Sequence, residues 1–237
     1  MSKKIIEGDV KLGRLYLDSF PDFLEGVEEV DGSFHCDNNK LTSFKNIPQK
    51  IRGSFLCYNN QLTSLEGGPQ EVHGDYFCDG NKLQTLKGAP RIIHFDFLCS
   101  NVNLKSLEGA PLKVERLFDC SSSPITSLHG SPREVGEIDC SYCNLNTLEG
   151  APTKVRYSFN CNQNQLTSLV GAPREVHGDF KCSRNKLTSL EGIPAFVGGF
   201  FACEDNEGLA FTEEEVRAVC RVEGEVYVGE SYINVNR

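Results

Sequence analysis

The amino-acid sequence predicts a repeat solenoid, in which short units of nearly constant length stack to make one continuous core. Three positions recur with a single period, which is the pattern of stacked repeats. Nine cysteines follow one another at steps of 21 residues, with one step of 20: Cys36, Cys57, Cys78, Cys99, Cys120, Cys140, Cys161, Cys182 and Cys203. An aromatic residue or Ile138 stands two residues before each cysteine, and a proline stands twelve residues after eight of them. We therefore expect roughly nine to ten units.

Each unit is expected to begin with a short strand. The aromatic residue and the cysteine are two residues apart, so both side chains point to the same face of a strand, which we take as the core. Three residues after the cysteine stands an asparagine in six units: Asn39, Asn60, Asn81, Asn164, Asn185 and Asn206. Its amide can bind backbone groups where the chain leaves the strand, and repetition along the stack predicts an asparagine ladder.

One unit carries a known repeat signature. Residues 135–145 match the pattern L-x-x-L-x-L-x-x-N/C-x-L, with Cys143 at the N/C position. The chain thus resembles leucine-rich-repeat proteins, with short repeats similar to those of bacterial effectors, over about residues 15–211. The Leu-Glu-Gly-Ala-Pro segments also resemble repeat proteins of large tailed bacteriophages. The resemblance implies a horseshoe or arc with a parallel β-sheet on its concave face and few helices.

The ends of the chain depart from the repeat. We expect residues 1–30 to form an N-terminal cap and a degenerate first repeat, residues 31–211 the repeats, and residues 212–237 a C-terminal cap. Thr212 and Glu215 make a capping box, which predicts a helix over about 213–222 that ends at Gly224. Its inner face would carry Val216, Val219 and Cys220. Two strands, over 226–228 and 232–235, would follow.

The cysteines are expected to be free, buried thiols, because an odd number in one column cannot pair completely. Cys140 and Cys143 form a C-x-x-C motif, but both occupy repeat positions, so we assign them no metal or redox role. Cys220 lies outside the repeats and is also expected to be structural. The sequence therefore predicts no catalytic residue, no metal site and no cofactor, and a protein that is not an enzyme.

Composition excludes other classes of function. The formal net charge is -9 and the sequence pI is about 5.1, which argues against direct binding of nucleic acid. No stretch approaches the roughly 20 apolar residues of a membrane span, and the N-terminus does not read as a secretory signal. We expect a cytoplasmic protein, in the host cytoplasm if a phage encodes it.

The side chains that alternate with the core residues are expected to form a binding face. Leu56, Phe77 and Leu98 occupy one outward column in successive units, with Tyr58 beside them. Acidic residues surround this predicted apolar patch: Asp75, Asp79, Asp96, Asp119, Glu137 and Asp139. Apolar anchors with a charged rim are typical of a protein-binding site, and the acids would select a partner with a basic surface.

Several alternatives stay open. The patch could instead pack against a second copy of the chain, giving a homo-oligomer, or beneath the N-terminal cap. The function that we favour is a scaffold that sequesters or inhibits a protein, as a phage or bacterial effector acting on a host defence protein. The alternatives are an acidic decoy that imitates nucleic acid and occupies a DNA-binding protein, and a self-associating structural protein.

Overall fold

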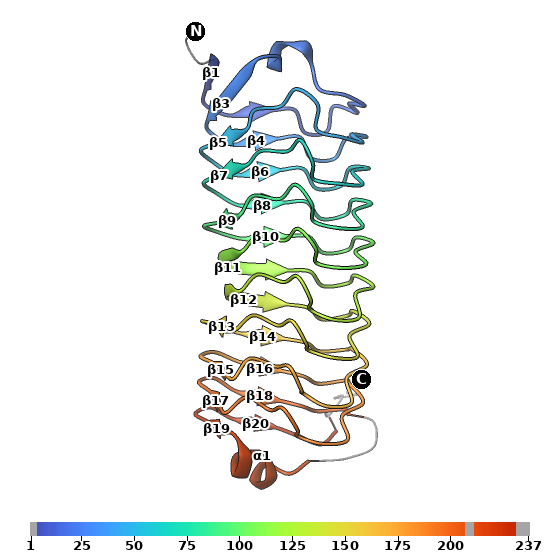
Figure 1. Ribbon diagram of the computed structural model, residues 1–237, viewed down its shortest axis with the longest axis vertical. Helices are drawn as coiled ribbons and strands as arrows, with labels where there is room; N and C mark the ends of the chain where they lie inside the picture. The colour runs from blue at the N-terminus through green and yellow to red at the C-terminus, as the bar shows by residue number, and fades with distance from the viewer. Residues whose placement is uncertain (1–3, 207–210, 231–237) are drawn as a thin grey trace, which may run out of the picture.

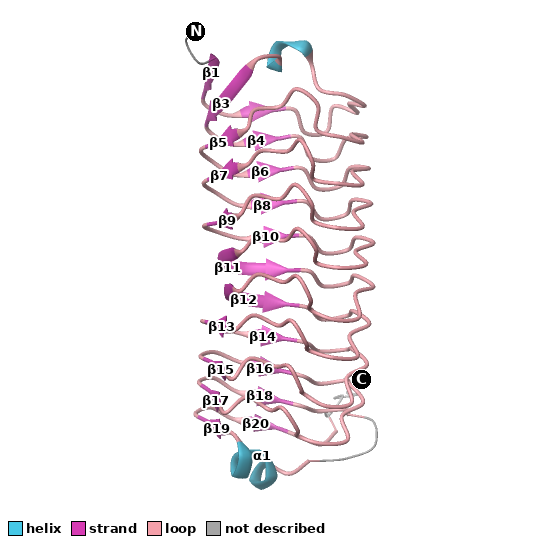
Figure 2. Cartoon of the chain, in the orientation of Figure 1, coloured by secondary structure: helices cyan, strands magenta, loops and turns pink. Residues whose placement is uncertain are grey.

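The computed structural model describes residues 4–206 and 211–230, which form a solenoid of parallel strands. Each turn contributes two short strands, and the turns stack one above another in chain order along the long axis (Figure 1). Helix is scarce in the described part (Figure 2): a 3₁₀ turn at Asp22–Leu24 and helix α1 at Glu213–Val219. The predicted repeat solenoid is thereby confirmed.

The strands form two columns. The first column holds β1 (Lys4–Glu7), β3 (Val27–Asp31), β5 (Lys50–Ile51), β7 (Glu71–Val72), β9 (Ile92–Ile93), β13 (Lys154–Val155), β15 (Glu175–Val176), β17 (Phe196–Val197) and β19 (Arg221–Val222). The second holds β2 (Val10–Lys11), β4 (Phe34–His35), β6 (Phe55–Leu56), β8 (Tyr76–Phe77), β10 (Phe97–Leu98), β14 (Phe159–Asn160), β16 (Phe180–Lys181), β18 (Phe201–Ala202) and β20 (Val226–Tyr227). Two longer strands, β11 (Lys113–Asp119) and β12 (Glu134–Asp139), run through both columns.

The core follows the predicted alternation. The aromatic residues two positions before the column cysteines are fully buried, and their rings follow one another from turn to turn. Ring centroids lie 5.2 Å apart for Tyr76 and Phe97, and 5.3 Å apart for Phe159 and Phe180. Ile138 takes this position in one turn and is equally buried. The inward assignment of the aromatic column is confirmed, and parallel pairing in register explains why one aromatic residue meets the next.

The thiol column is also confirmed. All eleven cysteines are free and buried. Several thiols donate to a carbonyl oxygen of the next turn, as Cys99 Sγ does to Asp119 O at 3.1 Å and Cys140 Sγ to Asn160 O at 3.2 Å. Burial raises the pKa of these thiols well above the usual value, which keeps them protonated and able to donate.

The asparagine ladder exists as predicted. In one rung, Asn60 Oδ1 accepts the Leu41 N–H at 3.0 Å, and Asn60 Nδ2 donates to the carbonyls of Cys36 and Cys57 at 2.9 and 3.0 Å. Each amide therefore ties its own turn to the preceding one. Three consecutive turns lack the asparagine and carry Val102, Ser123 and Cys143 at this position, so the ladder is interrupted in the middle of the stack.

The turn between the leucines and the proline requires glycine. Gly109 has a φ of +87°, and a Cβ there would lie 2.4 Å from the backbone nitrogen of Lys87 in the preceding turn. Gly88, one turn earlier, has a φ of +95° and an equally close approach. Left-handed backbone in contact with the neighbouring turn leaves no room for another side chain. This explains the glycine that recurs before the prolines.

At the N-terminal end, β2 extends the second column and pairs Val10 with Phe34. Asn39 Oδ1 accepts the N–H groups of Leu15 and Leu17, so the asparagine ladder also reaches this turn. Phe20 packs against Phe34 with ring centroids 6.0 Å apart. Residues before the first column cysteine thus complete one further turn of the solenoid.

The C-terminal end corrects part of the expectation. The capping box is present, but α1 ends at Val219 rather than at 222, and Cys220 already leads into β19. Val216 and Cys220 are buried, one helical turn apart, whereas Val219 is 56% exposed. The prediction for Val219 was wrong because the helix buries only the narrow stripe along Val216 and Cys220. β20 lies within the predicted strand over 226–228, and the strand predicted over 232–235 lies outside the described residues.

Candidate protein-interaction surface

The second column of strands carries the surface that the sequence singled out. We call it the sheet face: the outward side chains three residues before, one before and one after each column cysteine. Strand register places Leu56 beside Phe77 and Phe77 beside Leu98, in successive turns. All three are half-buried. The structure therefore brings the predicted apolar residues together in one row on one surface.

Tyr58 lies next to this row. Burial and a hydrogen bond with Asp37 raise the pKa of the Tyr58 hydroxyl, and Arg14 opposes the shift. The phenol therefore sits between a carboxylate and a guanidinium of the two preceding turns. It adds a polar, hydrogen-bonding edge to the apolar row at its N-terminal side.

The acids of the predicted rim have a structural task that the sequence did not reveal. Asp75 Oδ1 accepts the Asp96 N–H at 3.2 Å, and Asp96 Oδ1 in turn accepts the Leu117 N–H at 3.1 Å. Asp79 Oδ1 accepts both the N–H and the hydroxyl of Ser100, at 3.1 and 3.0 Å. These carboxylates therefore bind backbone of the next turn, and only their remaining lone pairs face outward.

The other rim acids follow along the same face. Asp119 is paired in register with Asp139, and Asp139 accepts hydrogen bonds from Ser141 N–H at 2.9 Å and Asn160 Nδ2 at 2.9 Å. Burial raises the pKa of Asp79, Asp119 and Glu137, and neighbouring carboxylates add to the effect. A cation that approached this part of the face would favour the charged carboxylates and lower these pKa values.

Sequence reasoning missed a second feature, at the C-terminal end of the sheet face. A hollow of about 590 Å³ lies there, lined among others by Lys181, Phe200 and Tyr227. The two rings meet edge to face with centroids 5.4 Å apart, and Lys181 Nζ lies 5.3 Å from the Phe200 centroid. Tyr227 pairs in register with Ala202 in a last turn that lacks the column cysteine, so the cysteine period did not assign it to this face.

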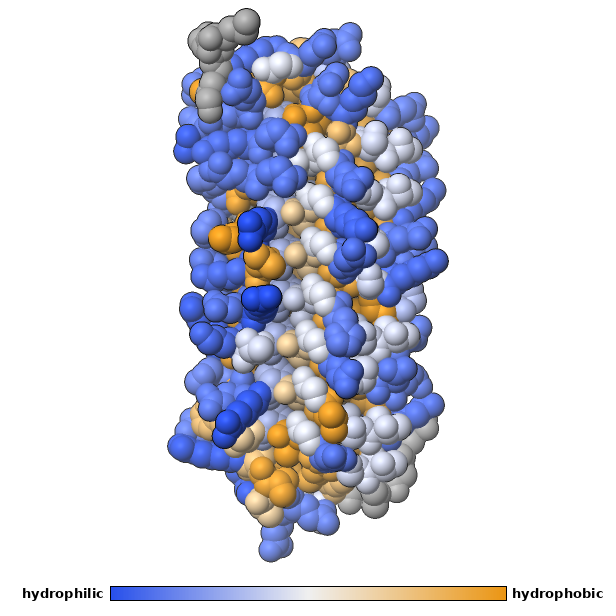
Figure 3. Space-filling view, in the orientation of Figure 1, coloured by the Kyte–Doolittle hydropathy of each residue, from blue (hydrophilic) through white to orange (hydrophobic). Residues whose placement is uncertain are grey.

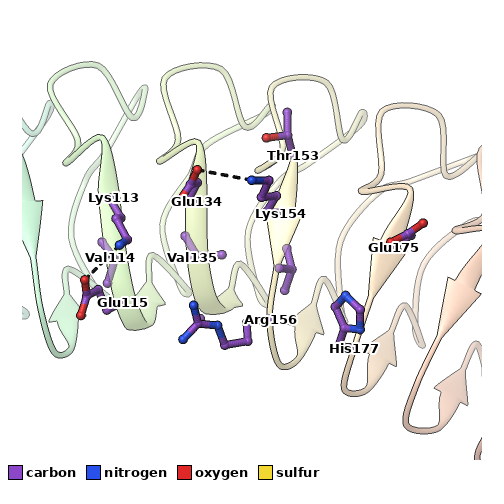
Figure 4. Close-up of a pocket in the computed structure, with 12 residues that line it drawn as sticks. Lys113, Val114, Glu115, Glu134, Val135, Thr153, Lys154, Arg156, Glu175 and His177 are labelled. Carbon is purple, nitrogen blue, oxygen red and sulfur yellow. Dashed lines mark hydrogen bonds and ion pairs between the residues drawn. The ribbon is translucent and has the colours of Figure 1, made fainter.

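The shortened turn produces another hollow, of about 260 Å³, outside the sheet face. Gly136 stands alone where other turns have two residues, and a Cβ there would lie 2.4 Å from Glu115 O. Figure 4 shows the Arg156 side chain extending across this hollow toward β12. Around it run the ion pairs Lys113–Glu115 and Glu134–Lys154, at 3.0 and 3.8 Å. The rim is thus of mixed charge over a valine floor.

The structure offers little support for chemistry. Within residues 4–206 and 211–230, no group of three or more His, Cys, Asp or Glu side chains could hold a metal ion. Cys143 Sγ points to the carbonyls of Cys120 and Ser141, both at 3.5 Å, rather than to Cys140. Burial raises the pKa of Cys220 to about 11, which is unfavourable for a nucleophile. Among the described residues, no helix has the length and apolar character needed to cross a bilayer.

Comparison with known proteins agrees with the fold. The sequence matches no protein-family model and no curated protein sequence. Among solved structures, the chain is similar to YopM from Yersinia enterocolitica WA-314, with a TM-score of 0.61 at 20% sequence identity. The match covers 92% of this chain and 52% of that one, so this chain spans about half the length of its structural neighbour. The chain therefore has the fold of a leucine-rich-repeat solenoid.

Proposed function

We propose that the protein is a non-catalytic scaffold that binds another protein through its sheet face. The observation that carries the proposal is the row Leu56, Phe77 and Leu98, which register aligns in three successive turns of the sheet face. Buried apolar area supplies most of the affinity of a protein interface, and aromatic and aliphatic anchors concentrate it. A row of this kind on a rigid strand column is pre-organised for such a contact.

The rim acids define the partner. Asp79, Asp119, Asp139 and Glu137 follow one another along the same face, and their charges act on one another. Lys181 offsets part of the charge of Glu137, and within the described residues no ion pair forms at Asp79, Asp119 or Asp139. The negative potential of these acids favours a partner that carries Lys or Arg, and it raises the rate of association more than it adds affinity. The finer proposal is therefore a phage or bacterial effector that sequesters or inhibits a host defence protein with a basic surface, in the cytoplasm.

Imitation of nucleic acid is a weaker alternative. A decoy needs an even row of carboxylates open to solvent, in place of phosphates. Here Asp75, Asp96 and Asp79 use part of their hydrogen-bonding capacity within the stack. The apolar row lies between Asp75 and Asp96 on one side and Asp79 on the other, so these acids do not form one continuous strip. The geometry favours a mixed apolar and polar contact with a folded protein.

The test is an affinity capture with the tagged protein from its native host. We expect Leu56→Asp/Phe77→Asp to abolish the capture of a partner that wild type retains. The matched control is Val170→Asp/Val219→Asp, which adds the same two charges at residues that are 42% and 56% exposed and lie off the sheet face. Equal capture by wild type and the double variant would contradict the assignment of the patch. Loss of capture in the control as well would point to a general charge effect.

A further inference from the structure

A second row of residues, outside the sheet face, has an unusual composition. Arg91, Leu112 and Arg133 occupy equivalent positions in three successive turns, just before the first strand column. Leu112 N–H donates to Arg91 O at 2.8 Å, and Arg133 N–H donates to Leu112 O at 3.0 Å, so the three are direct neighbours. We call them the basic row. Figure 3 shows hydrophobic side chains among strongly hydrophilic ones at this level, near β9 and β11.

The basic row is available for contact. Leu112 is 46% exposed, and Ile92 beside it is 49% exposed. Arg91 and Arg133 are exposed, and within the described part of the chain neither has an ion pair. Together with Lys113 and Glu134 they line a shallow hollow of about 490 Å³. The chain as a whole has a net charge of -9, so two unpaired arginines around exposed aliphatic side chains are a local exception. Their charge and the apolar side chains favour a partner surface that is both acidic and apolar.

The chain itself carries the complement. Asp96, Leu117 and Glu137 occupy equivalent positions on the sheet face in the same three turns, and we call them the acidic row. Leu117 N–H donates to Asp96 Oδ1 at 3.1 Å, and Leu117 is paired in register with Glu137. All three side chains are half-buried. The order is acid, leucine, acid, against arginine, leucine, arginine in the basic row.

The spacing between neighbouring turns sets the distance between side chains in both rows. Each row advances by one strand spacing per turn, about 4.8 Å, so the outer charges are about 10 Å apart in both. A second solenoid of the same kind meets this spacing without adjustment. Within one chain, Leu112 and Leu117 are separated by about five residues of extended backbone, roughly 16 Å. The two rows of one molecule therefore cannot contact each other, and both remain open to neighbours.

We propose that the basic row of one copy docks on the acidic row of the next. With the two copies aligned in the same direction, Leu112 would pack against Leu117, Arg91 would meet Asp96, and Arg133 would meet Glu137. Asp96 already lies 3.5 Å from Arg116 Nε, in an ion pair whose Arg116 side chain is 61% exposed and whose Asp96 side chain is 21% exposed, so an arginine of the second copy would share the Asp96 carboxylate with Arg116. Because the contact joins two different surfaces, it is heterologous and can continue from copy to copy. The inference goes beyond the proposed function, since it needs neither the apolar row nor a foreign partner.

A charge exchange tests the pairing. Arg133→Glu and Glu137→Lys each place like charges opposite one another between copies, whereas the double variant restores opposite charges with their positions exchanged. The double variant also keeps the net charge of -9, since the two changes cancel. Sedimentation velocity over a concentration series at low salt measures association. We expect each single variant to weaken association by at least about tenfold, and the double variant to regain it.

Glu137 is a suitable site because, within residues 4–206 and 211–230, its carboxylate makes no hydrogen bond that ties one turn to the next, so the stack should tolerate the change. Circular dichroism melting of all four proteins checks the fold. Wild type that stays monomeric at every concentration in low salt would overturn the proposal. So would single variants that associate like wild type, or a double variant that behaves like the singles. Arg133→Glu leaves the sheet face intact, so partner capture by that variant separates this proposal from the proposed function.

Discussion

The asparagine ladder makes a strong prediction, because one side chain satisfies backbone groups of two turns. Asn185 is 2% exposed, and its Oδ1 accepts the Leu166 N–H at 3.1 Å. Its Nδ2 donates to the carbonyls of Cys161 and Cys182, both at 3.0 Å. Asn185→Ala would leave one N–H and two carbonyls buried without these partners. Each unsatisfied group costs about 1–3 kcal/mol, and partial relaxation lowers the sum, so we expect a loss of about 3–5 kcal/mol in the free energy of unfolding.

Urea unfolding followed by circular dichroism measures this loss, with Asn146→Ala as the control. Asn146 is exposed, and the same substitution there should change stability by less than about 0.5 kcal/mol. Repeat proteins can unfold in parts, so amide exchange at Leu166 provides a local measurement, and its protection should fall. If Asn185→Ala lowered the free energy of unfolding by an amount within about 1 kcal/mol of the control, the reasoning would be refuted, because the ladder asparagine would then stabilise the fold no more than a surface residue does.

The interrupted rungs provide the converse test. Val102 is 4% exposed and stands at the ladder position of its turn. Val102→Asn should supply an acceptor for the Leu83 N–H and donors for the carbonyls of Cys78 and Cys99. We expect a gain of about 1 kcal/mol in the urea experiment, since the new bonds exceed the lost apolar contact. A loss of stability would show that packing around Val102, rather than backbone satisfaction, governs this turn.

Three further predictions concern single positions. Tyr76→Phe should raise stability by about 1–2 kcal/mol in urea unfolding, because the buried Tyr76 hydroxyl has no hydrogen-bond partner among the described residues. A decrease in stability would mean that the hydroxyl does find a partner. Gly109→Ala should lower stability by about 2–4 kcal/mol, since it combines a positive φ with a Cβ that meets the Lys87 backbone; an unchanged midpoint would contradict that contact. Burial raises the pKa of Asp79 above 3.8, so the folded state binds this proton more tightly and the charged form costs stability at neutral pH. This cost disappears as the pH falls through the raised pKa of Asp79. Asp79→Asn keeps an acceptor for Ser100, so it should stabilise the fold at pH 7 and have no effect on stability well below pH 3.8. Equal changes in stability at both pH values would exclude this linkage.

Periodic positions were the part of the structure that the sequence could predict. Every turn places equivalent residues in equivalent surroundings, so the identity of Phe97 and Phe118 reports the same buried site twice. The amide of Asn60 could be assigned to the backbone for the same reason, because six copies of one polar residue in a core column need a common partner. Register then followed from the period, and with it the row that contains Leu56 and Phe77.

Positions that break the period were harder to predict. Val219 belongs to a helix that occurs once, so no second copy showed which of its apolar residues is buried. Asp75 and Asp96 read as surface charges, because polarity alone does not distinguish a solvated carboxylate from one that accepts a neighbouring N–H. Ser and Asp recur at the position three residues before the column cysteine, and this recurrence was the signal that could have revealed their hydrogen bonds to the next turn. Tyr227 lies in a turn whose cysteine is replaced by Val228, so it escaped the column count.

The two proposals share residues, and this overlap has a consequence. Asp96 and Glu137 belong both to the rim around the apolar row and to the acidic row that would receive a second copy. A protein that covers the rim must therefore displace the neighbouring copy, and binding energy spent on displacement is lost from the apparent affinity for the partner. The apparent affinity for the partner should accordingly increase as the scaffold is diluted below the concentration at which copies associate. Arg133→Glu disrupts the basic row and therefore contact between copies, so this variant should bind the partner with the same affinity at all concentrations. If wild type also showed no such dependence, contact between copies and partner binding would not compete for Asp96 and Glu137.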